Sequence, residues 1–413
     1  MKVFLTVHRA TDQIGGNCIE IACDDGERII LDVGRPLDAP KEAIGLLPRS
    51  LNLDDPVAGI LISHPHQDHY GLLEETPANW PVYSGKSAGA LMHLTASLFG
   101  TAPVRDYRHW QGGKPIQIGS FKVTPYLTDH SAFDAYMLLI EAAGKRILYS
   151  GDFRVHGRKA KLVQNLMQSP PPDLDVLLME GTNLGSNKAT DSETDLEDDF
   201  AGLFRSTPGR VFICWSAQNI DRTVSIYRAC LKSGRTLAVD LYTAEVLELL
   251  ADAGRLPRAG WNNLKVVITR SFVRLYKSKG RGDFVERMAA HGVSASRLVD
   301  DCSKWVIMIR PSLMRDMIPK GVVPNSNDGW SYSQWSGYLK QPDGVALKAW
   351  FDQGGAKATH IHTSGHASVA NLQAFAAAMN PKALVPIHGV AWDSDSDGFC
   401  NIVRLRDGEP LTV

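Results

Sequence analysis

The chain has 413 residues and a mass of 45.2 kDa, which at roughly 150 residues per domain predicts two or three domains. Hydrophobic residues make up 44% and charged residues 22% of the sequence, a balance that excludes disordered and low-complexity chains. A formal net charge of −1 gives no global attraction for polyanions, so any nucleic-acid surface must be local. The amino terminus turns polar too early for a secretory signal, and no apolar run of about 18 residues occurs, so we expect a cytoplasmic location and no membrane partner.

Short apolar segments that end in Gly, Pro or Asp turns predict a sheet-rich first part of the chain. One helix, about residues 86–99, interrupts them and is expected to cover a sheet. The segments 135–142 and 146–149 flank Ala143-Gly144-Lys145 and predict a hairpin. The expected strands are residues 3–7, 17–22, 28–33, 59–63, 116–125, 135–142, 146–149 and 176–179.

From about residue 209 the pattern changes to strand and helix in alternation, which predicts a small parallel α/β domain. The acidic stretch before it, residues 191–199, is typical of a solvated helix start, because acidic residues oppose the positive end of a helix. A strand at 359–363, a helix at 369–379 and a strand at 383–387 follow. We therefore expect a first domain segment at 1–200, an inserted domain at 201–354 and a return to the first domain at 355–413.

The segment with the clearest chemistry is 63–71, Ser-His-Pro-His-Gln-Asp-His-Tyr-Gly, directly after the apolar residues 59–62. In an extended segment His64 and His66 point the same way, so both imidazoles can reach one cation. Asp68 and His69 in the following turn can face a second cation. The spacing indicates a two-metal site.

Three further candidate ligands stand at the ends of predicted strands. They are Asp32 in Leu31-Asp32-Val33, His130 in Thr128-Asp129-His130, and Asp152 after Ser150-Gly151. A carboxylate after a strand is often only a turn residue, but their combination with the histidine cluster favours a metal centre.

These four segments resemble the motifs of the metallo-β-lactamase superfamily, which are Asp, H-x-H-x-D-H, His and Asp in chain order. The resemblance implies an α/β fold of the αββα sandwich type that binds two zinc ions. It implies that His64, His66 and His130 hold one zinc and that Asp68 and His69 hold the other. Asp152 would bridge the two ions, and Asp32 would support the site from behind.

Later segments resemble the β-CASP nucleases of this superfamily, including the ribonuclease J family. Residues 178–183, Leu-Met-Glu-Gly-Thr-Asn, match the acidic motif A through Glu180. Residues 362–368, His-Thr-Ser-Gly-His-Ala-Ser, match motif B through His366, and residues 386–389, Pro-Ile-His-Gly, match motif C through His388. The α/β segment 201–354 takes the place of the β-CASP cap.

This resemblance implies a zinc-dependent phosphodiester hydrolase, acting as an exonuclease, an endonuclease or both. Single-stranded RNA is the expected substrate, and DNA is the alternative. His388 could complete the second metal site and His366 could protonate the leaving oxygen, with Asp68, Glu180 and Asp32 as the other catalytic candidates. Phosphate oxygens could be bound by residues next to His366, namely Ser364, Gly365 and Ser368.

Other interpretations remain open from the residues alone. The metal core does not choose between carbonyl and phosphoryl centres, so a hydrolase of a small ester, lactone or thioester is one alternative. A non-catalytic RNA-binding subunit is another, and the oligomeric state is open.

The basic segment 270–281, interleaved with Phe272 and Tyr276, is either a phosphate-tracking surface or a solvated face. For the aromatic residues Trp330, Tyr332, Trp335 and Tyr338 we favour packing over base stacking.

Overall fold

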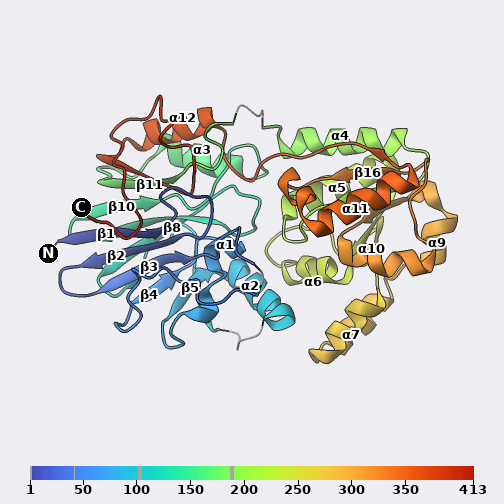
Figure 1. Cartoon of the computed structure of the whole chain (residues 1–413), viewed down its shortest axis with the longest axis horizontal. Helices are drawn as coiled ribbons and strands as arrows, with labels where there is room; N and C mark the ends of the chain where they lie inside the picture. The colour runs from blue at the N-terminus through green and yellow to red at the C-terminus, as the bar shows by residue number, and fades with distance from the viewer. Residues whose placement is uncertain (1, 41, 101–104, 187–189) are drawn as a thin grey trace. The chain divides into compact units, whose positions relative to one another are not determined.

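The computed structural model describes residues 2–40, 42–100, 105–186 and 190–413, which form two compact units (Figure 1). The first unit consists of Met1–Thr190 with Gly365–Val413, and the second of Asp191–Ser364. The sequence analysis placed these boundaries ten residues further inward on both sides. The difference arises because Ser192 caps helix α4 (Glu193–Ser206) by accepting from the Asp195 amide, and the whole helix then packs on helix α5 (Ile220–Ser233) of the second unit.

The first sheet of the first unit has the strand order β19-β1-β2-β3-β4-β5-β6. Its amino-terminal strand β1 alternates buried and half-buried side chains, as expected for a strand with one face on the core. Strand β3 is buried along its whole length. The strands are β1 (Val3–Arg9), β2 (Cys18–Cys23), β3 (Arg28–Val33), β4 (Gly59–Leu61), β5 (Val82–Gly85), β6 (Tyr107–Trp110) and β19 (Pro410–Thr412).

The second sheet of this unit has the order β18-β11-β10-β9-β8-β7. Strands β10, β11 and β18 run parallel to one another, whereas β9 is antiparallel to both of its neighbours, β8 and β10. The strands are β7 (Ile116–Ile118), β8 (Phe121–Leu127), β9 (Tyr136–Ala142), β10 (Lys145–Tyr149), β11 (Val176–Glu180) and β18 (Ala383–Ile387).

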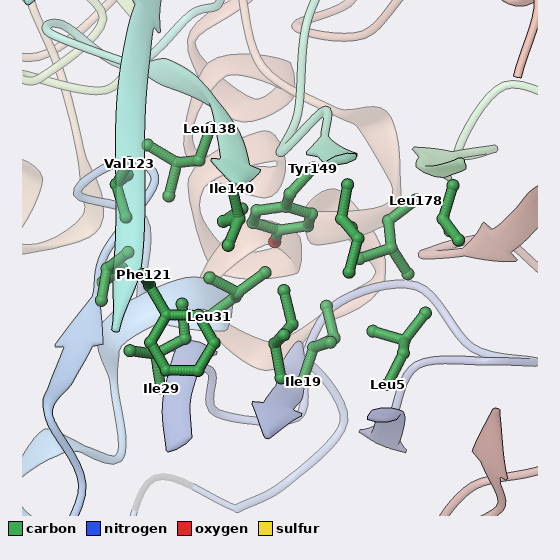
Figure 2. Close-up of a cluster of buried hydrophobic side chains, with 14 of the residues drawn as sticks. Leu5, Ile19, Ile29, Leu31, Phe121, Val123, Leu138, Ile140, Tyr149 and Leu178 are labelled. Carbon is green, nitrogen blue, oxygen red and sulfur yellow. The ribbon is translucent and has the colours of Figure 1, made fainter. Parts of the chain in front are cut away.

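The two sheets pack face to face around one hydrophobic core (Figure 2), in which Leu31 and Ile29 of the first sheet meet Phe121, Ile140 and Tyr149 of the second. Helices α1 (Gln67–Tyr70) and α2 (Lys86–Phe99) bury side chains on the outer face of the first sheet. Helices α3 (Ala160–Gln168) and α12 (Val369–Met379) do so on the outer face of the second (Figure 1). The first unit is therefore an αββα sandwich.

The second unit is built on an all-parallel sheet with the order β14-β13-β15-β12-β16-β17. Its central strands are entirely buried, which is typical of a parallel sheet covered on both faces. The strands are β12 (Val211–Cys214), β13 (Thr236–Asp240), β14 (Leu264–Val267), β15 (Trp305–Met308), β16 (Gly329–Tyr332) and β17 (Lys357–Ala358). The helices besides α4 and α5 are α6 (Leu241–Leu249), α7 (Arg270–Ser278), α8 (Gly282–Ala289), α9 (Ala295–Asp300), α10 (Pro311–Met317) and α11 (Pro342–Gly354).

The aromatic residues of this unit divide into two groups. The Trp330 ring stacks on Phe351 with centroids 4.5 Å apart, and Tyr332 is buried, so packing explains these two residues. Trp335 and Tyr338 are exposed and contact each other edge to face. The packing interpretation therefore covers only half of the group.

Two of the predicted strands are wrong in detail. The segment 116–125 forms two strands, β7 and β8, because Gly119 takes a left-handed backbone with φ of +57° and reverses the chain. The segment 359–363 is not a strand, because the Ile361 amide and carbonyl bond the hydroxyls of Ser331 and Ser333 instead of a neighbouring backbone. Within the described residues, no helix combines the length and the apolar character that crossing a membrane requires.

Candidate active site

All predicted site residues except Ser364 belong to the first unit. Most of them lie at or just after the ends of strands β3, β4, β8, β10, β11 and β18, and the others lie directly before helix α12. Parallel pairing orients β3 with β4, and β10 with β11 and β18, so their carboxyl ends lie at the same edge of each sheet. Ligand sites are common at such edges, because the loops there carry the side chains outward from a rigid frame. This topology explains how residues more than 300 positions apart meet.

The first set of donor atoms belongs to His64, His66 and His130, whose ligand atoms lie within 4.8 Å of one another. Nε2 of His130 lies 3.2 Å from Nδ1 of His66. On its other side His130 donates through Nδ1 to the Gly365 carbonyl at 2.6 Å, which fixes the ring so that Nε2 faces the site. Three imidazoles at this separation suit a zinc ion.

The second set consists of Asp68, His69, Asp152 and His388. Asp152 lies between the two sets, since its Oδ2 is 3.2 Å from His69 Nε2 and 3.7 Å from His64 Nε2. His388 completes the group, with Nε2 at 3.4 Å from Asp68 Oδ2 and Nδ1 at 3.4 Å from Asp152 Oδ1. The seven residues expected to bind metal are therefore brought together.

Burial and neighbouring charges keep donors of both sets in the protonation states that bind cations. Burial, followed by the neighbouring His69, lowers the pKa of His64 well below its usual value, and burial also lowers the pKa of His66 and His130. These rings are thus held in the neutral form that metal binding requires. Although burial opposes it, the charge of His69 with that of His388 lowers the pKa of Asp68 to about 2. The carboxylate therefore stays ionised.

Whether the cluster fits a metal ion can be judged from two buried atoms that lack hydrogen-bond partners among the described residues. These atoms are His64 Nε2 and Asp152 Oδ1. Leaving such atoms unsatisfied costs free energy unless another ligand takes them up. Their position among imidazoles and carboxylates matches the donor chemistry of divalent zinc, so the residues fit a metal centre.

Asp32 supports this cluster from its buried side. Its Oδ2 accepts from His69 Nδ1 at 2.7 Å and from the Tyr149 hydroxyl at 2.6 Å, and the Ser63 amide and hydroxyl bond its two oxygens, each at 2.7 Å. The carboxylate thereby sets which nitrogen of His69 faces Asp68 and Asp152 of the second donor set. Asp32 orients a donor and has no direct place in either donor set.

The backbone is bent where donors leave their strands. Asp32 has φ of +57° and His388 has φ of +49°, a left-handed conformation that costs free energy for residues other than glycine. Gly151, just before Asp152, has φ of +51°, and a Cβ there would lie 3.2 Å from both Ser63 Cβ and the Tyr136 carbonyl oxygen. Strain of this kind, present here at Asp32 and His388, is characteristic of functional sites.

His366 lies beside the second donor set and is paired with Glu180. Its Nδ1 donates to Glu180 Oε2 at 2.8 Å, and the other oxygen of Glu180 accepts from the Phe153 amide at 2.8 Å. Burial alone would lower the pKa of His366, but Glu180 and Asp152 outweigh it and raise the pKa to about 9. The ring therefore carries a proton at neutral pH.

The three predicted phosphate-binding residues occupy different positions. The Gly365 carbonyl positions His130, as described above. Ser368 caps helix α12 by accepting from the Asn371 amide. Ser364 is the last residue of the second unit. Contact of these residues with a phosphate remains a prediction.

Three residues that support the site were not singled out from the sequence. The Thr182 hydroxyl donates to Glu180 Oε2 at 2.6 Å and lies 3.0 Å from His388 Nδ1, so it links the two residues. Asn183 holds the segment that carries His366 by donating to the His366 and Ala367 carbonyls, both at 3.0 Å. Tyr149 bonds Asp32. Two polar residues that follow Glu180 after an intervening glycine, Gly181, were the only available signal for the first two.

Comparisons with known proteins agree with this geometry. A family model described as "Metallo-beta-lactamase superfamily" matches residues 11–184. The ribonuclease J of Helicobacter pylori strain 26695 is 25% identical over 435 aligned positions, covering 97% of this chain and 59% of that protein. The ribonuclease J 1 of Streptococcus pyogenes serotype M3 is 24% identical, covering 81% and 58%. The chain thus spans about three-fifths of the length of these relatives.

Among solved structures, a protein of unknown function from Enterococcus faecalis V583 has the same fold over the full length of both chains, with a TM-score of 0.79 and 20% sequence identity. The fold class predicted from the sequence is confirmed: it is a metallo-β-lactamase sandwich with an inserted α/β domain.

Proposed function

From the metallo-β-lactamase domain in residues 11–184 and the chain-wide similarity to ribonuclease J, we propose that this protein is a zinc-dependent ribonuclease. The observation that carries the proposal is the Glu180–His366 pair beside the two donor sets. A metal centre alone would serve many hydrolases. A protonated histidine held next to it is the additional group that cleavage of an RNA strand needs.

His366 would act as the general acid. The departing ribose oxygen is a poor leaving group, and protonating it removes the developing negative charge. Glu180 holds the proton-bearing ring through Nδ1 and keeps it cationic. Cations bound in the two donor sets would lower this pKa from about 9 toward neutrality, where a general acid works best.

Two zinc ions would be held by His64, His66 and His130 and by Asp68, His69 and His388, with Asp152 between them. When bound, they would supply Lewis-acid activation of water and neutralise charge at phosphorus. The remaining residues hold this arrangement: Asp32 orients His69, and the Gly365 carbonyl orients His130.

Charge also favours a phosphodiester over a small ester, lactone or thioester. A phosphodiester arrives as an anion and gains negative charge during attack, whereas a carbonyl compound arrives neutral. Two metal positions and an imidazolium provide more positive charge than a neutral substrate requires. A thiolate leaving group would also have little need of the His366 proton.

The test is a substrate panel run with the zinc-loaded protein. End-labelled single-stranded RNA, DNA of the same sequence, and a set of lactones and thioesters are incubated in parallel, and the nucleic-acid products are resolved by length. We expect RNA cleavage, with the product lengths distinguishing removal of single nucleotides from internal cuts. Efficient turnover of a lactone or thioester without cleavage of either oligonucleotide would refute the proposal.

A further inference from the structure

Helix α7 of the second unit carries an unusual stripe of positive charge. Arg270, Arg274 and Lys277 are all exposed, and their spacing of four and three residues places them on one face of the helix. Phe272 and Tyr276 lie on another face and are buried, with Tyr276 stacked on Phe284 of α8 at 5.8 Å. The aromatic residues of this segment therefore pack the helix in place, and the cations are displayed to solvent.

The stripe has no counter-charge of its own. None of the three cations has an ion-pair partner among the described residues, whereas some other cations of the same unit do. Lys232 pairs with Glu197 and Asp198. Arg281, which follows α7, is held by Glu245. Residues 251–290 contain nine Lys or Arg against three Asp or Glu, in a chain whose net charge is −1. This excess is local to one part of the second unit.

The arrangement also works against the stability of the helix. Like charges at spacings of three and four residues repel, and Arg270 occupies the first helical position, where the macrodipole disfavours a cation. Local arrangements that oppose folding are commonly kept for function. Three solvent-facing cations without partners, extending about 10 Å along a helix, would suit a chain of regularly spaced phosphates.

We propose that the α7 stripe, Arg270, Arg274 and Lys277, binds the phosphate backbone of an RNA strand. The stripe belongs to the second unit, whereas the metal donors belong to the first. Figure 1 shows α7 extending from the second unit, and the three side chains are exposed to solvent. The inference rests on the proposed function, since it takes the same RNA as its ligand. It adds a binding surface that would select for substrate length and for low ionic strength, independently of the bond that is cleaved.

The experiment measures binding of full-length, zinc-loaded protein to a labelled single-stranded RNA of about 20 nucleotides across a salt series, with His366→Ala in the background to prevent cleavage. The test variant carries Arg270→Gln, Arg274→Gln and Lys277→Gln. The control variant carries Lys114→Gln, Lys161→Gln and Lys357→Gln, which replace three exposed cations in separate segments of the chain, so it has the same net charge as the test variant. Circular dichroism verifies that both variants fold.

We expect the slope of log affinity against log salt to fall by about 2 in the test variant, because each lost phosphate contact removes about 0.7. Its affinity at low salt should fall about tenfold or more, while the control keeps the wild-type slope. In the His366-intact background, hydrolysis of bis(p-nitrophenyl) phosphate should be equal in all three proteins, because this small diester cannot span the stripe.

Each other outcome is decisive. RNA cleavage by the wild type with equal salt slopes in the test and control variants would overturn this inference and leave the proposed function intact. Binding of the same proteins to phosphatidylserine vesicles is measured in parallel. If the test variant loses vesicle binding but binds RNA as the wild type does, the inference is also overturned, because the stripe then serves a lipid surface. No binding and no cleavage of RNA by the wild type would overturn both.

Discussion

Replacing Tyr149 by phenylalanine should weaken both the folded state and the second metal position. The Tyr149 ring is fully buried in the core between the sheets (Figure 2), and its hydroxyl donates to Asp32 Oδ2 at 2.6 Å. The same hydroxyl accepts from Asn17 Nδ2 at 2.9 Å. Burial, with the charge of Asp32, raises the pKa of Tyr149 well above its usual value, so the hydroxyl remains a donor at every working pH.

The magnitude follows from these two bonds. A hydrogen bond to a charged acceptor contributes about 1.5 to 3 kcal/mol, and the buried Asn17 amide left without its acceptor costs about 1 to 3 kcal/mol more. The ring itself stays, so no large cavity opens. We expect a loss of about 3 kcal/mol in the free energy of unfolding of the metal-free protein, measured by urea titration. Zinc affinity should fall about 10- to 100-fold, because Asp32 then holds His69 less firmly.

Tyr136→Phe is the matched control. Its ring lies in the same core, and its hydroxyl donates to Asp134 at 2.7 Å, which is not among the donor residues. This variant should lose stability but keep the zinc affinity of the wild type. The reasoning is refuted if both variants weaken zinc binding equally, or if Tyr149→Phe changes neither quantity.

Further predictions concern the metal donors and the second unit. His66→Ala and Asp152→Ala should each lower bound zinc and hydrolysis together, and elemental analysis showing wild-type zinc content in either variant would contradict the ligand assignment. His388→Ala should weaken one metal position and leave the three-histidine set loaded, so a chelator titration should show one weak and one wild-type site; loss of both would argue against separate sets. Burial and then Arg222 lower the pKa of His362 to about 3, so the folded state keeps this ring neutral while the unfolded chain protonates it below about 6.5. Stability should therefore fall as the pH drops from about 6.5 toward 3, and His362→Gln should reduce that slope in acid titrations followed by circular dichroism; an unchanged slope would be the contrary result.

The donor set could be predicted from the sequence because the chemistry is concentrated in short segments at strand ends. His64, His66, Asp68 and His69 lie within six positions, and an apolar strand precedes them, so their convergence follows from local geometry. The helix at 369–379 and the strand at 383–387 were predicted with the bounds that the structure has, because a capping Ser368 and a continuous apolar run mark them.

The supporting contacts could not be predicted in this way. Tyr149 reaches Asp32 across 117 positions, and Thr182 reaches His388 across 206, so neither contact leaves a local pattern.

The basic segment was ambiguous for a different reason. Its aromatic residues resembled a stacking surface, but the helical spacing of Phe272 and Tyr276 places them in the interior. In the sequence, Phe272 and Tyr276 are four residues apart and alternate with basic residues. This spacing fits both a base-stacking surface and a buried helix face, so only the fold distinguishes the two.

The central claim is tested most directly by one comparison of wild type and His366→Ala, with zinc content and RNA cleavage measured on the same preparations. The account predicts about two zinc ions per chain in both proteins and a rate of single-stranded RNA cleavage that is about 10²- to 10⁴-fold lower in the variant. Full zinc occupancy with no cleavage by the wild type, or equal cleavage by the two zinc-loaded proteins, would contradict it.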